Sequence, residues 1–296
     1  MIVVTAPTGH IGSQLVPRLL TAGPPVRVIA RQPEKLPAEI QSRVEIVRGS
    51  SDDIKVLSLA FKDADAVFWL VPPSFQHPDL GAYMRHFTEP ACAAIAAQGV
   101  QRVVAVSGLG RGVAKSSFVL SGFGMDEMIE RTGVNYRALW CPAFMENTLW
   151  QVQSIKHQGT FFAPNRPDVR TPLVATRDIA ASAARLLLDK SWTGQGGIAV
   201  LGPEDLSCND RARIMSDVLG KPIRYQQIPP GDYKAQLMRN GASEAMAQGL
   251  VDMAAEIDKH GLYNAEPRTP ENTTPTTFRV WCDQVLKPAV LGDART

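Results

Sequence analysis

The chain opens on Ile2-Val3-Val4-Thr5-Ala6-Pro7-Thr8-Gly9-His10-Ile11-Gly12, and this stretch decides its fold. The run from Ile2 to Thr5 is short and β-branched, which predicts a buried strand. From Ile11 to Ala22 the apolar residues recur with the spacing of one helical face, namely Ile11, Leu15, Val16, Leu19 and Leu20. A strand followed at once by a helix predicts a βα unit whose turn contains two glycines.

The same alternation of short strands and longer helices continues along the first half of the chain. Helical stretches at Leu80 to Gln98 and Ser116 to Arg131 lie between runs rich in β-branched or aromatic residues. Those runs are Val26 to Ala30, Val44 to Val47, Ala66 to Val71, Arg102 to Val106 and Tyr136 to Cys141. Because strands that alternate with helices pair in parallel and are covered on both faces, we expect a doubly wound α/β sheet.

The turn between the first strand and the first helix has the composition of a phosphate-binding loop. Small residues let the backbone approach a pyrophosphate, and the N–H groups and dipole at the helix start stabilise its charge. Gly9 and Gly12 keep two glycine positions of the dinucleotide fingerprint, whereas Ala6 replaces the first glycine and Pro7 removes one donor. We expect a negative φ at Ala6, since left-handed backbone disfavours alanine. The dinucleotide-binding residues predicted in this turn are Thr5, Ala6, Pro7, Thr8, Gly9, His10, Ile11 and Gly12, and a purely structural tight turn is the alternative.

Arg31, at the end of the second predicted strand, indicates which dinucleotide is bound. A protein that binds NAD usually has an acidic residue here, which accepts a hydrogen bond from the ribose 2′-OH. A guanidinium can instead stack on adenine and pair with a 2′-phosphate, and Gln32 and Lys35 add a donor and a charge. We therefore predict NADPH or NADP as the cofactor in preference to NADH. A solvated surface arginine is the alternative.

Beyond Pro142 the alternation of strands and helices becomes less regular, until a clear helix is predicted from Asp178 to Leu188. The rest is mostly helical, with a predicted strand at Ile223 to Ile228 and helices at Asn209 to Leu219, Tyr233 to Arg239, Ser243 to His260 and Phe278 to Leu286. We therefore predict a dinucleotide-binding domain of residues 1–150, to which residues 172–205 return. Residues 206–296, together with 151–171, form a smaller and mostly helical lobe that contacts the substrate or a partner.

Composition and charge exclude several classes of protein. The chain has 296 residues, of which 45% are hydrophobic and 20% charged, as in ordinary globular proteins. Its 31 basic and 29 acidic residues leave a formal charge of +2, too little for a basic nucleic-acid-binding stripe. No apolar stretch approaches the roughly 20 residues of a membrane span, and no basic segment precedes Ile2, so we expect a cytoplasmic protein. The four cysteines lack disulfide or metal-ligand spacing, which predicts free thiols and no metal site.

Several short motifs follow the predicted strands in order along most of the chain. They are Val4 to Gly12, Arg31, Gly49-Ser50-Ser51-Asp52, Leu70-Val71-Pro72-Pro73, Val106-Ser107-Gly108, Cys141-Pro142-Ala143-Phe144-Met145-Glu146-Asn147 and Arg177-Asp178-Ile179-Ala180. In this order and spacing the chain resembles the NmrA-like family of atypical short-chain dehydrogenases/reductases. The resemblance implies a Rossmann-type fold that binds NAD(P).

The resemblance also implies roles for residues outside the first turn. It places Asp52 near the adenine and the loop of Leu70, Val71 and Pro72 beside the ribose. By the same resemblance the loop of Pro142, Ala143 and Phe144 lies beside the nicotinamide. For Asp52 the alternative role is that of a helix N-cap.

The proton relay typical of the superfamily is missing from the sequence. It consists of a Tyr-x-x-x-Lys pair on the helix after the fifth strand, where the ammonium lowers the pKa of the phenol. None of the five tyrosines has a lysine four residues later, and Asp126-Glu127 stands where many family members have a lysine. Two catalytic candidates remain: Ser107, where the superfamily's serine hydrogen-bonds a substrate carbonyl, and Lys115, which could approach the nicotinamide ribose. Their alternatives are a strand-end turn residue and an exposed lysine.

Substrate residues are expected in the loops at the strand ends, because ligands of open α/β sheets bind beyond the carboxyl ends of the strands. The candidates are Phe75, His77, Phe118, Phe123, Phe144, Asn147, Trp150 and Phe161. Aromatic side chains favour burial, so packing is the alternative role for most of them. His77 is the one histidine placed for an acid role, with an ordinary loop histidine as its alternative.

Together these residues favour an NADPH-dependent oxidoreductase that transfers hydride to a small quinone-like, aromatic or conjugated acceptor. The hydride comes from the cofactor, so water can supply the proton where no protein acid is present. The missing Tyr and Lys favour the alternative, a non-catalytic redox sensor that binds NAD(P)H and engages a protein partner. A sugar epimerase or dehydratase fits less well, because Arg31 suits NADP and the base is missing. A homodimer and a regulatory protein partner are both left open.

Overall fold

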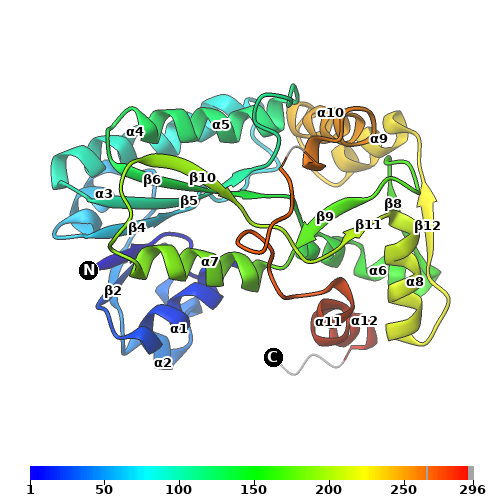
Figure 1. Ribbon diagram of the computed structural model, residues 1–296, viewed down its shortest axis with the longest axis horizontal. Helices are drawn as coiled ribbons and strands as arrows, with labels where there is room; N and C mark the ends of the chain where they lie inside the picture. The colour runs from blue at the N-terminus through cyan, green and yellow to red at the C-terminus, as the bar shows by residue number, and fades with distance from the viewer. Residues whose placement is uncertain (265, 293–296) are drawn as a thin grey trace. The chain divides into compact units, whose positions relative to one another are not determined.

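The computed structural model describes residues 1–264 and 266–292, and its chain divides into two compact units (Figure 1). The first unit comprises Met1–Gly108, Leu120–Trp140 and Ile179–Ala199. The second comprises Leu109–Val119, Cys141–Asp178 and Val200–Thr296. The domain boundaries predicted from the sequence stay a prediction, and residues 265 and 293–296 of the predicted lobe lie outside the described residues.

The first unit is built on a seven-stranded parallel sheet, which confirms the predicted fold class. The strand order is β10-β6-β5-β4-β1-β2-β3. The strands are β1 (Ile2–Val4), β2 (Val26–Ala30), β3 (Glu45–Arg48), β4 (Ala66–Trp69), β5 (Arg102–Gly108), β6 (Asn135–Cys141) and β10 (Gln195–Ala199). In the register, Val3 of β1 is level with Arg27 of β2 on one side and with Val67 of β4 on the other.

Helices cover both faces of this sheet. In Figure 1, α3, α4 and α5 lie along one face, and α1 and α7 lie along the other. These helices are α1 (Gly12–Ala22), α3 (Ile54–Phe61), α4 (Leu80–Gln98), α5 (Ser117–Glu130) and α7 (Thr176–Leu188), and a short α2 (Ala38–Gln41) precedes β3. On the α3 side, Phe61, Trp69 and Tyr136 are completely buried in one continuous core. Because both faces of the sheet are buried, its central strands are apolar throughout rather than alternating.

The strand order reverses between β1 and β4. From β1 the chain proceeds outwards to β2 and β3, and it then returns to place β4 on the other side of β1. The helices after these two strands leave on opposite faces, so the loops that follow β1 and β4 diverge at their carboxyl ends. Ligands of open α/β sheets bind at such a switch point, and the predicted phosphate-binding turn lies there.

A buried ion pair joins the amino-terminal ends of the central strands in the first unit. Arg102, at the start of β5, has a side chain only 4% exposed and lies 2.7 Å from Asp65, which precedes β4. The same guanidinium donates to the backbone carbonyls of Leu187 and Asp189. Burial raises the pKa of the Asp65 carboxyl, but the charges of Arg102 and Lys190 outweigh it and hold that pKa below its ordinary value.

Replacing this carboxylate is expected to reduce stability in a pH-dependent way. Asp65→Asn leaves a buried guanidinium without its counter-charge, which we expect to cost about 2 kcal/mol at neutral pH. The figure is kept low because the Asp65 side chain is 32% exposed and therefore screened by solvent. Since the folded-state pKa is lowered, the contribution is present above about pH 4 and is lost as the pH falls through the folded-state value.

Urea unfolding at neutral pH and at about pH 3 tests this expectation. The difference between wild type and Asp65→Asn should be large at neutral pH and should shrink in acid. Glu127→Gln is the matched control, because its partner Arg131 lies 3.8 Å away and both side chains are exposed. That exposed pair is worth less than about 0.5 kcal/mol. If Asp65→Asn lost the same free energy of unfolding at both pH values, the stabilisation would not depend on the ionisation of Asp65.

The second unit contains two small sheets and the remaining helices. Its strands are β7 (Ala143–Phe144), β8 (Thr160–Ala163), β9 (Thr171–Val174), β11 (Asp205–Leu206) and β12 (Arg224–Gln227), in the orders β11-β9-β7 and β12-β8. Its helices are α6 (Val152–Gln158), α8 (Cys208–Leu219), α9 (Pro230–Arg239), α10 (Glu244–His260), α11 (Phe278–Trp281) and α12 (Lys287–Leu291). The predicted final helix therefore continues beyond Leu286, through a π-helical turn at Cys282–Leu286.

A buried carboxylate holds distant segments of the second unit together. Glu146 accepts hydrogen bonds from the backbone N–H and the hydroxyl of Thr176, the latter at 2.7 Å. It also accepts one at 3.1 Å from the indole N–H of Trp281, whose ring stacks on Phe278. A buried carboxylate with several donors is well satisfied, so we assign Glu146 of the Phe144 to Asn147 motif a structural role.

All four cysteines are free thiols. Cys141, Cys208 and Cys282 are buried, whereas Cys92 is half-buried. Burial raises the pKa of each thiol, to about 11 for Cys92 and about 12 for Cys282. Among the described residues, no group of three His, Cys, Asp or Glu side chains is arranged to hold a metal ion. Nor does any helix in residues 1–264 or 266–292 have the length and apolar character needed to cross a membrane.

Candidate functional site

Thr5 ties the predicted phosphate-binding turn to the loop after β4. Its buried hydroxyl lies 3.1 Å from the carbonyl of Phe68, to which it donates, and accepts the N–H of Leu70 at 2.9 Å. Further along the turn, Pro7, Ile11 and Gly12 are buried, whereas Thr8 and His10 are exposed. The buried residues therefore fix the turn against the sheet. The exposed ones face solvent, where a ligand can reach them.

Ala6 has a backbone φ of +49°, and the negative value expected from the sequence is wrong. In this conformation the Ala6 carbonyl accepts the N–H of Gly9 at 3.1 Å. It also packs against Gly12, where an added Cβ would lie only 2.2 Å from the Ala6 oxygen. The tight approach of the turn to α1 thus imposes a left-handed residue at a position where the sequence has alanine.

Replacing Ala6 with glycine is expected to stabilise the protein. A left-handed alanine costs about 1–2 kcal/mol, and replacement regains only part of it, because glycine has more freedom to lose from the unfolded chain. We expect a net gain of about 0.5–1 kcal/mol in the free energy of unfolding, measured by urea denaturation. Ala93→Gly, on the exposed side of α4, is the control of opposite sign and should lose about 1 kcal/mol. A lower free energy of unfolding for Ala6→Gly would contradict the inference that Ala6 is strained.

The start of α1 is suited to an anion. The residue before the helix is Ile11, which cannot cap it, and the first turn holds no acidic side chain. No side-chain hydrogen bond therefore caps this helix at Ile11. The N–H groups of Ser13 and Gln14 donate to the carbonyls of Gly9 and Ile11, and the positive end of the helix dipole favours a negatively charged ligand at this point.

Two residues predicted to contact the cofactor follow β2 and β3, and the charges of both act on one phenol. Arg31 directly follows β2 and is exposed, and Asp52 follows β3. The charges of both act on the phenol of Tyr83, in the first turn of α4. Burial raises the pKa of this phenol, Arg31 lowers it, Asp52 raises it, and the net direction is upward. The Tyr83 hydroxyl donates at 2.8 Å to the carbonyl of Pro72, which the sequence placed beside the ribose.

Asp52 does not cap α3, because the cap is its neighbour Asp53, which accepts the N–H of Lys55 at 2.8 Å. The alternative role considered for Asp52 is therefore wrong. Its carboxylate instead lies 3.2 Å from Nε2 of His86, one helical turn after Tyr83. Burial raises the pKa of Asp52, but hydrogen bonds from Ser50 and His86 outweigh it and keep that pKa below its ordinary value.

The sequence analysis missed Tyr83 and His86. They are three residues apart near the start of the helix that follows β4, so they lie on one helical face. That spacing, next to a strand-end loop already predicted to bind the ribose, was the available signal. His77 also lies here, with its ring 5.2 Å from that of Tyr83 and its Nδ1 accepting the N–H of Asp79 at 3.1 Å. Its predicted contact with substrate stays a prediction.

At the carboxyl end of β5, Ser107 forms a buried polar network. Its hydroxyl lies 2.6 Å from Oδ2 of Asp126 on α5. The other carboxylate oxygen of Asp126 accepts a 2.6 Å hydrogen bond from the hydroxyl of Tyr136 on β6. From the sequence, Asp126 was notable only as a departure from lysine, and Tyr136 was not singled out. Their connection to Ser107 depends on the pairing of a helix with two strands, which the sequence does not show.

The second unit contains Lys115, Phe118 and the segment after β6. Lys115 has an exposed side chain, and its backbone N–H donates at 2.9 Å to Glu256 of α10. Phe118 packs against the same helix, since an added Cβ at Gly249 would lie 3.0 Å from its Cβ.

The remaining predicted residues differ in exposure. Phe123 of α5, in the first unit, is 6% exposed, whereas Trp150, in the second, is 66% exposed. Pro142 is buried, and Ala143, Phe144 and Asn147 are half-buried. The roles assigned to these residues stay predictions.

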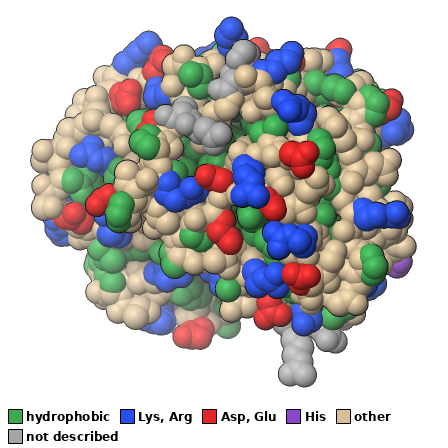
Figure 2. Space-filling view, turned by 45° about the vertical axis from the view of Figure 1, so that its right-hand side comes forward, with side chains coloured by type: hydrophobic (Ala, Val, Ile, Leu, Met, Phe, Trp, Pro, Cys, Tyr) green, Lys and Arg blue, Asp and Glu red, His purple; other side chains and the backbone are tan. Residues whose placement is uncertain are grey.

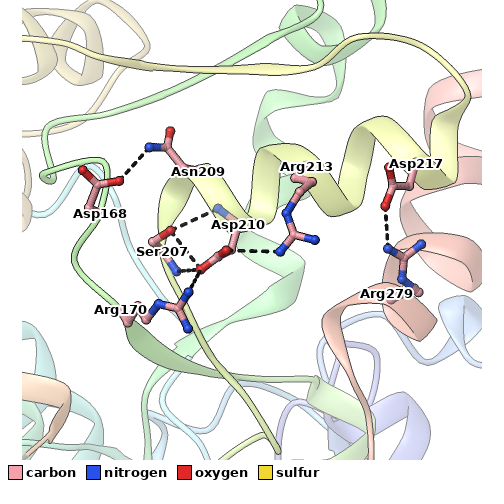
Figure 3. Close-up of polar contacts among 8 residues, drawn as sticks. All are labelled: Asp168, Arg170, Ser207, Asn209, Asp210, Arg213, Asp217 and Arg279. Carbon is pink, nitrogen blue, oxygen red and sulfur yellow. Dashed lines mark hydrogen bonds and ion pairs between the residues drawn. The ribbon is translucent and has the colours of Figure 1, made fainter.

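Charged side chains lie along α8 in the second unit, from its start at Asp210 to Asp217 in its last turn (Figure 3). Asp210 lies 3.1 Å from Arg170 and 3.2 Å from Arg213, and Arg279 lies 2.6 Å from Asp217. Figure 2 likewise shows basic and acidic side chains interspersed on the visible face. Because each arginine drawn in Figure 3 faces a carboxylate, this cluster offers no surplus positive charge to an anionic ligand.

Comparison with known proteins extends over most of the chain. The model of the NmrA-like family matches residues 1–279. A (4-alkanoyl-5-oxo-2,5-dihydrofuran-3-yl)methyl phosphate reductase of Streptomyces griseus is 32% identical over 240 residues, 80% of each chain. An NAD(P)H azoreductase of Xenophilus azovorans is 27% identical over 259 residues, 86% of each chain.

Among solved structures, the NADPH-dependent quinone oxidoreductase of Escherichia coli complexed with NADPH is similar in fold. Its TM-score is 0.78 at 20% identity, and the match covers 94% of this chain and 97% of that one. At this level of identity the likeness concerns the fold.

Proposed function

The chain belongs to the NmrA-like family, and from this premise we propose that it is an NADPH-dependent oxidoreductase that transfers hydride to a small quinone-like, aromatic or conjugated acceptor. The single observation that carries the proposal is the arrangement at the carboxyl ends of β1, β2 and β3. There the uncapped start of α1 and the guanidinium of Arg31 supply the two features that a phosphorylated dinucleotide needs.

The first turn fits a pyrophosphate. An added Cβ at Gly9 would meet only the Ala6 oxygen, at 3.5 Å, so the glycine leaves one side of the backbone open. We propose that the backbone from Thr8 to Gly12 holds the pyrophosphate, while Arg31 pairs with the 2′-phosphate and Asp52 and Pro72 border the adenosine half. When bound, the nicotinamide supplies the hydride.

The names of the relatives support the choice of acceptor. The Streptomyces relative is named for an unsaturated furanone and the Xenophilus relative for azo compounds, and the structural relative is a quinone oxidoreductase. The acceptors in all three names are conjugated molecules that can accept a hydride. Such a reaction suits a chain without the Tyr-x-x-x-Lys pair, because water can supply the proton.

The test is to mix the purified protein with NADPH or NADH and a panel of quinones, azo dyes and unsaturated lactones. Cofactor oxidation is followed by absorbance, and binding is measured by calorimetry without an acceptor. The proposal expects oxidation that depends on the acceptor and is faster with NADPH. The missing Tyr and Lys favour a second candidate, a redox sensor, which predicts NADPH binding without turnover. Absence of binding to either nucleotide would contradict both.

A further inference from the structure

Ser107, Asp126 and Tyr136 form a hydrogen-bonded network, whereas a serine in a strand-end turn needs no such partners. The three side chains come from β5, α5 and β6, all within the first unit. Asp126 and Tyr136 are completely buried, and Ser107 is 8% exposed. Ser107 is therefore the only one of these three residues with any access to the carboxyl end of the sheet, where the proposed reaction takes place.

The position of the hydroxyl protons determines what Ser107 can do. In its contact with Asp126 the Ser107 hydroxyl donates to Oδ2, and a serine hydroxyl has only one proton. The two oxygens of Asp126 face one hydroxyl each, both at 2.6 Å. The proton of Ser107 is thus directed at Asp126, and the Ser107 oxygen has only lone pairs left for a ligand.

The helix leaves room beside this oxygen. Gly122 precedes Asp126 by four residues, so both lie on the face of α5 that is turned to Ser107. An added Cβ at Gly122 would have one neighbour within 4 Å, the Ser107 oxygen itself at 4.0 Å. Gly122 and Asp126 have the same four-residue spacing as the missing Tyr-x-x-x-Lys pair. The glycine leaves space beside Ser107, and the carboxylate accepts the hydrogen bond of the serine hydroxyl.

We propose that Asp126 is a positioning residue that keeps Ser107 a hydrogen-bond acceptor, so that the ligand group touching Ser107 is an N–H or O–H donor. This inference rests on the proposed function, and it replaces the contact with a substrate carbonyl expected from the sequence. The donor belongs either to the nicotinamide half of the cofactor, as a carboxamide N–H or ribose O–H, or to an amino or hydroxyl substituent of the acceptor.

Three variants test the polarity of this contact. Ser107→Ala removes the acceptor, and Ser107→Thr keeps it. Asp126→Asn places an amide N–H against the Ser107 oxygen, which frees the serine proton for the ligand. Calorimetry measures the affinity for NADPH and, as a control, for its fragment without nicotinamide. Steady-state kinetics compares KM for an amino-substituted quinone and for its methyl-substituted analogue, which are similar in size.

If the donor is on the cofactor, Ser107→Ala and Asp126→Asn should each lower the affinity for NADPH about tenfold. The affinity for the fragment without nicotinamide should not change. If it is on the acceptor, NADPH affinity should stay constant while the preference for the amino over the methyl quinone falls about tenfold. In both cases Ser107→Thr should restore the wild-type value. These ratios do not move in a variant that is merely less stable, and Ser107→Ala alone suffices should Asp126→Asn fail to fold.

The proposal is overturned if a folded Ser107→Ala protein changes neither NADPH affinity nor the quinone ratio by more than twofold. It is also overturned if Asp126→Asn increases the preference for the amino quinone, because that would mean Ser107 donates in the wild type. Failure of the proposed function has a different signature, since the wild-type protein itself would then not bind NADPH.

Discussion

Replacing Gly12 with alanine is expected to destabilise the first unit by roughly 3 kcal/mol and to abolish measurable NADPH binding. The added Cβ would lie 2.2 Å from the Ala6 oxygen and 2.8 Å from the Pro7 Cα. Both are backbone atoms of the turn, so no side-chain rotation relieves the clash. Either α1 moves away from β1 or the turn opens, and each change removes the N–H groups from the position where they would hold a pyrophosphate.

Gly9→Ala is the matched control for this prediction. At Gly9 the added Cβ would lie 3.5 Å from the Ala6 oxygen, an ordinary contact, so the free energy of unfolding should change by less than about 0.5 kcal/mol. The methyl group would nevertheless occupy the open side of the turn and lower the affinity for NADPH. Urea unfolding and calorimetry on both variants separate the two effects. A Gly12→Ala protein as stable as the wild type would contradict the packing argument.

Arg31→Ala is expected to raise the Kd for NADPH about thirty- to one-hundredfold and to change the Kd for NADH less than about threefold. A guanidinium paired with a phosphate contributes roughly 2–3 kcal/mol through charge-assisted hydrogen bonds, and NADH lacks that phosphate. Arg31 is exposed, so its removal should not alter the fold. Arg31→Asp should go further and favour NADH, because a carboxylate accepts from the 2′-OH and repels the phosphate.

Arg131→Ala is the control for the loss of an exposed positive charge. Arg131 follows α5 and precedes β6, so it lies at the amino-terminal edge of the sheet, and its ion pair with Glu127 is exposed. Its removal should leave both affinities unchanged. Calorimetric titrations at one fixed salt concentration give all of these constants. Equal losses for NADPH and NADH in Arg31→Ala would rule out the contact with the 2′-phosphate.

Local patterns were sufficient to predict six of the seven strands of the central sheet. The strand Val26–Ala30 and the helix Leu80–Gln98 have the predicted bounds, and the helix Gly12–Ala22 begins one residue late. These segments combine a strong hydrophobic period with glycine, proline or aspartate at their ends, so sequence-local signals and the final packing agree.

Where the prediction failed, the cause lies in contacts between distant segments. The strand Gln195–Ala199 was missed because it contains two glycines, which are rare in strands. The structure explains Gly197: the indole of Trp140 on β6 fills the space where a Cβ would be, 2.0 Å from the nearest ring atom. Ala6 is a second case, because its positive φ follows from the approach of α1 and not from its own preference.

The candidate site divides in the same way. The first turn and Arg31 were predicted because a fixed distance along the chain separates them, and the dinucleotide motif encodes that distance. Tyr83, His86 and Asp126 were missed because their partners come from other segments of the chain. Pairs such as His86 with Asp52 or Asp126 with Ser107 are 34 and 19 residues apart, and only the folded sheet brings them together.

The state of the four thiols bears on the chemistry proposed for the protein. Quinones are electrophiles as well as oxidants, and they arylate cysteine thiolates, the nucleophilic form. With a pKa of about 11, only about one Cys92 in ten thousand is ionised at neutral pH, and the other three cysteines are enclosed. For the quinone acceptors that we propose, a protein built in this way offers almost no thiolate for covalent attack, and we expect turnover to continue without inactivation through its cysteines.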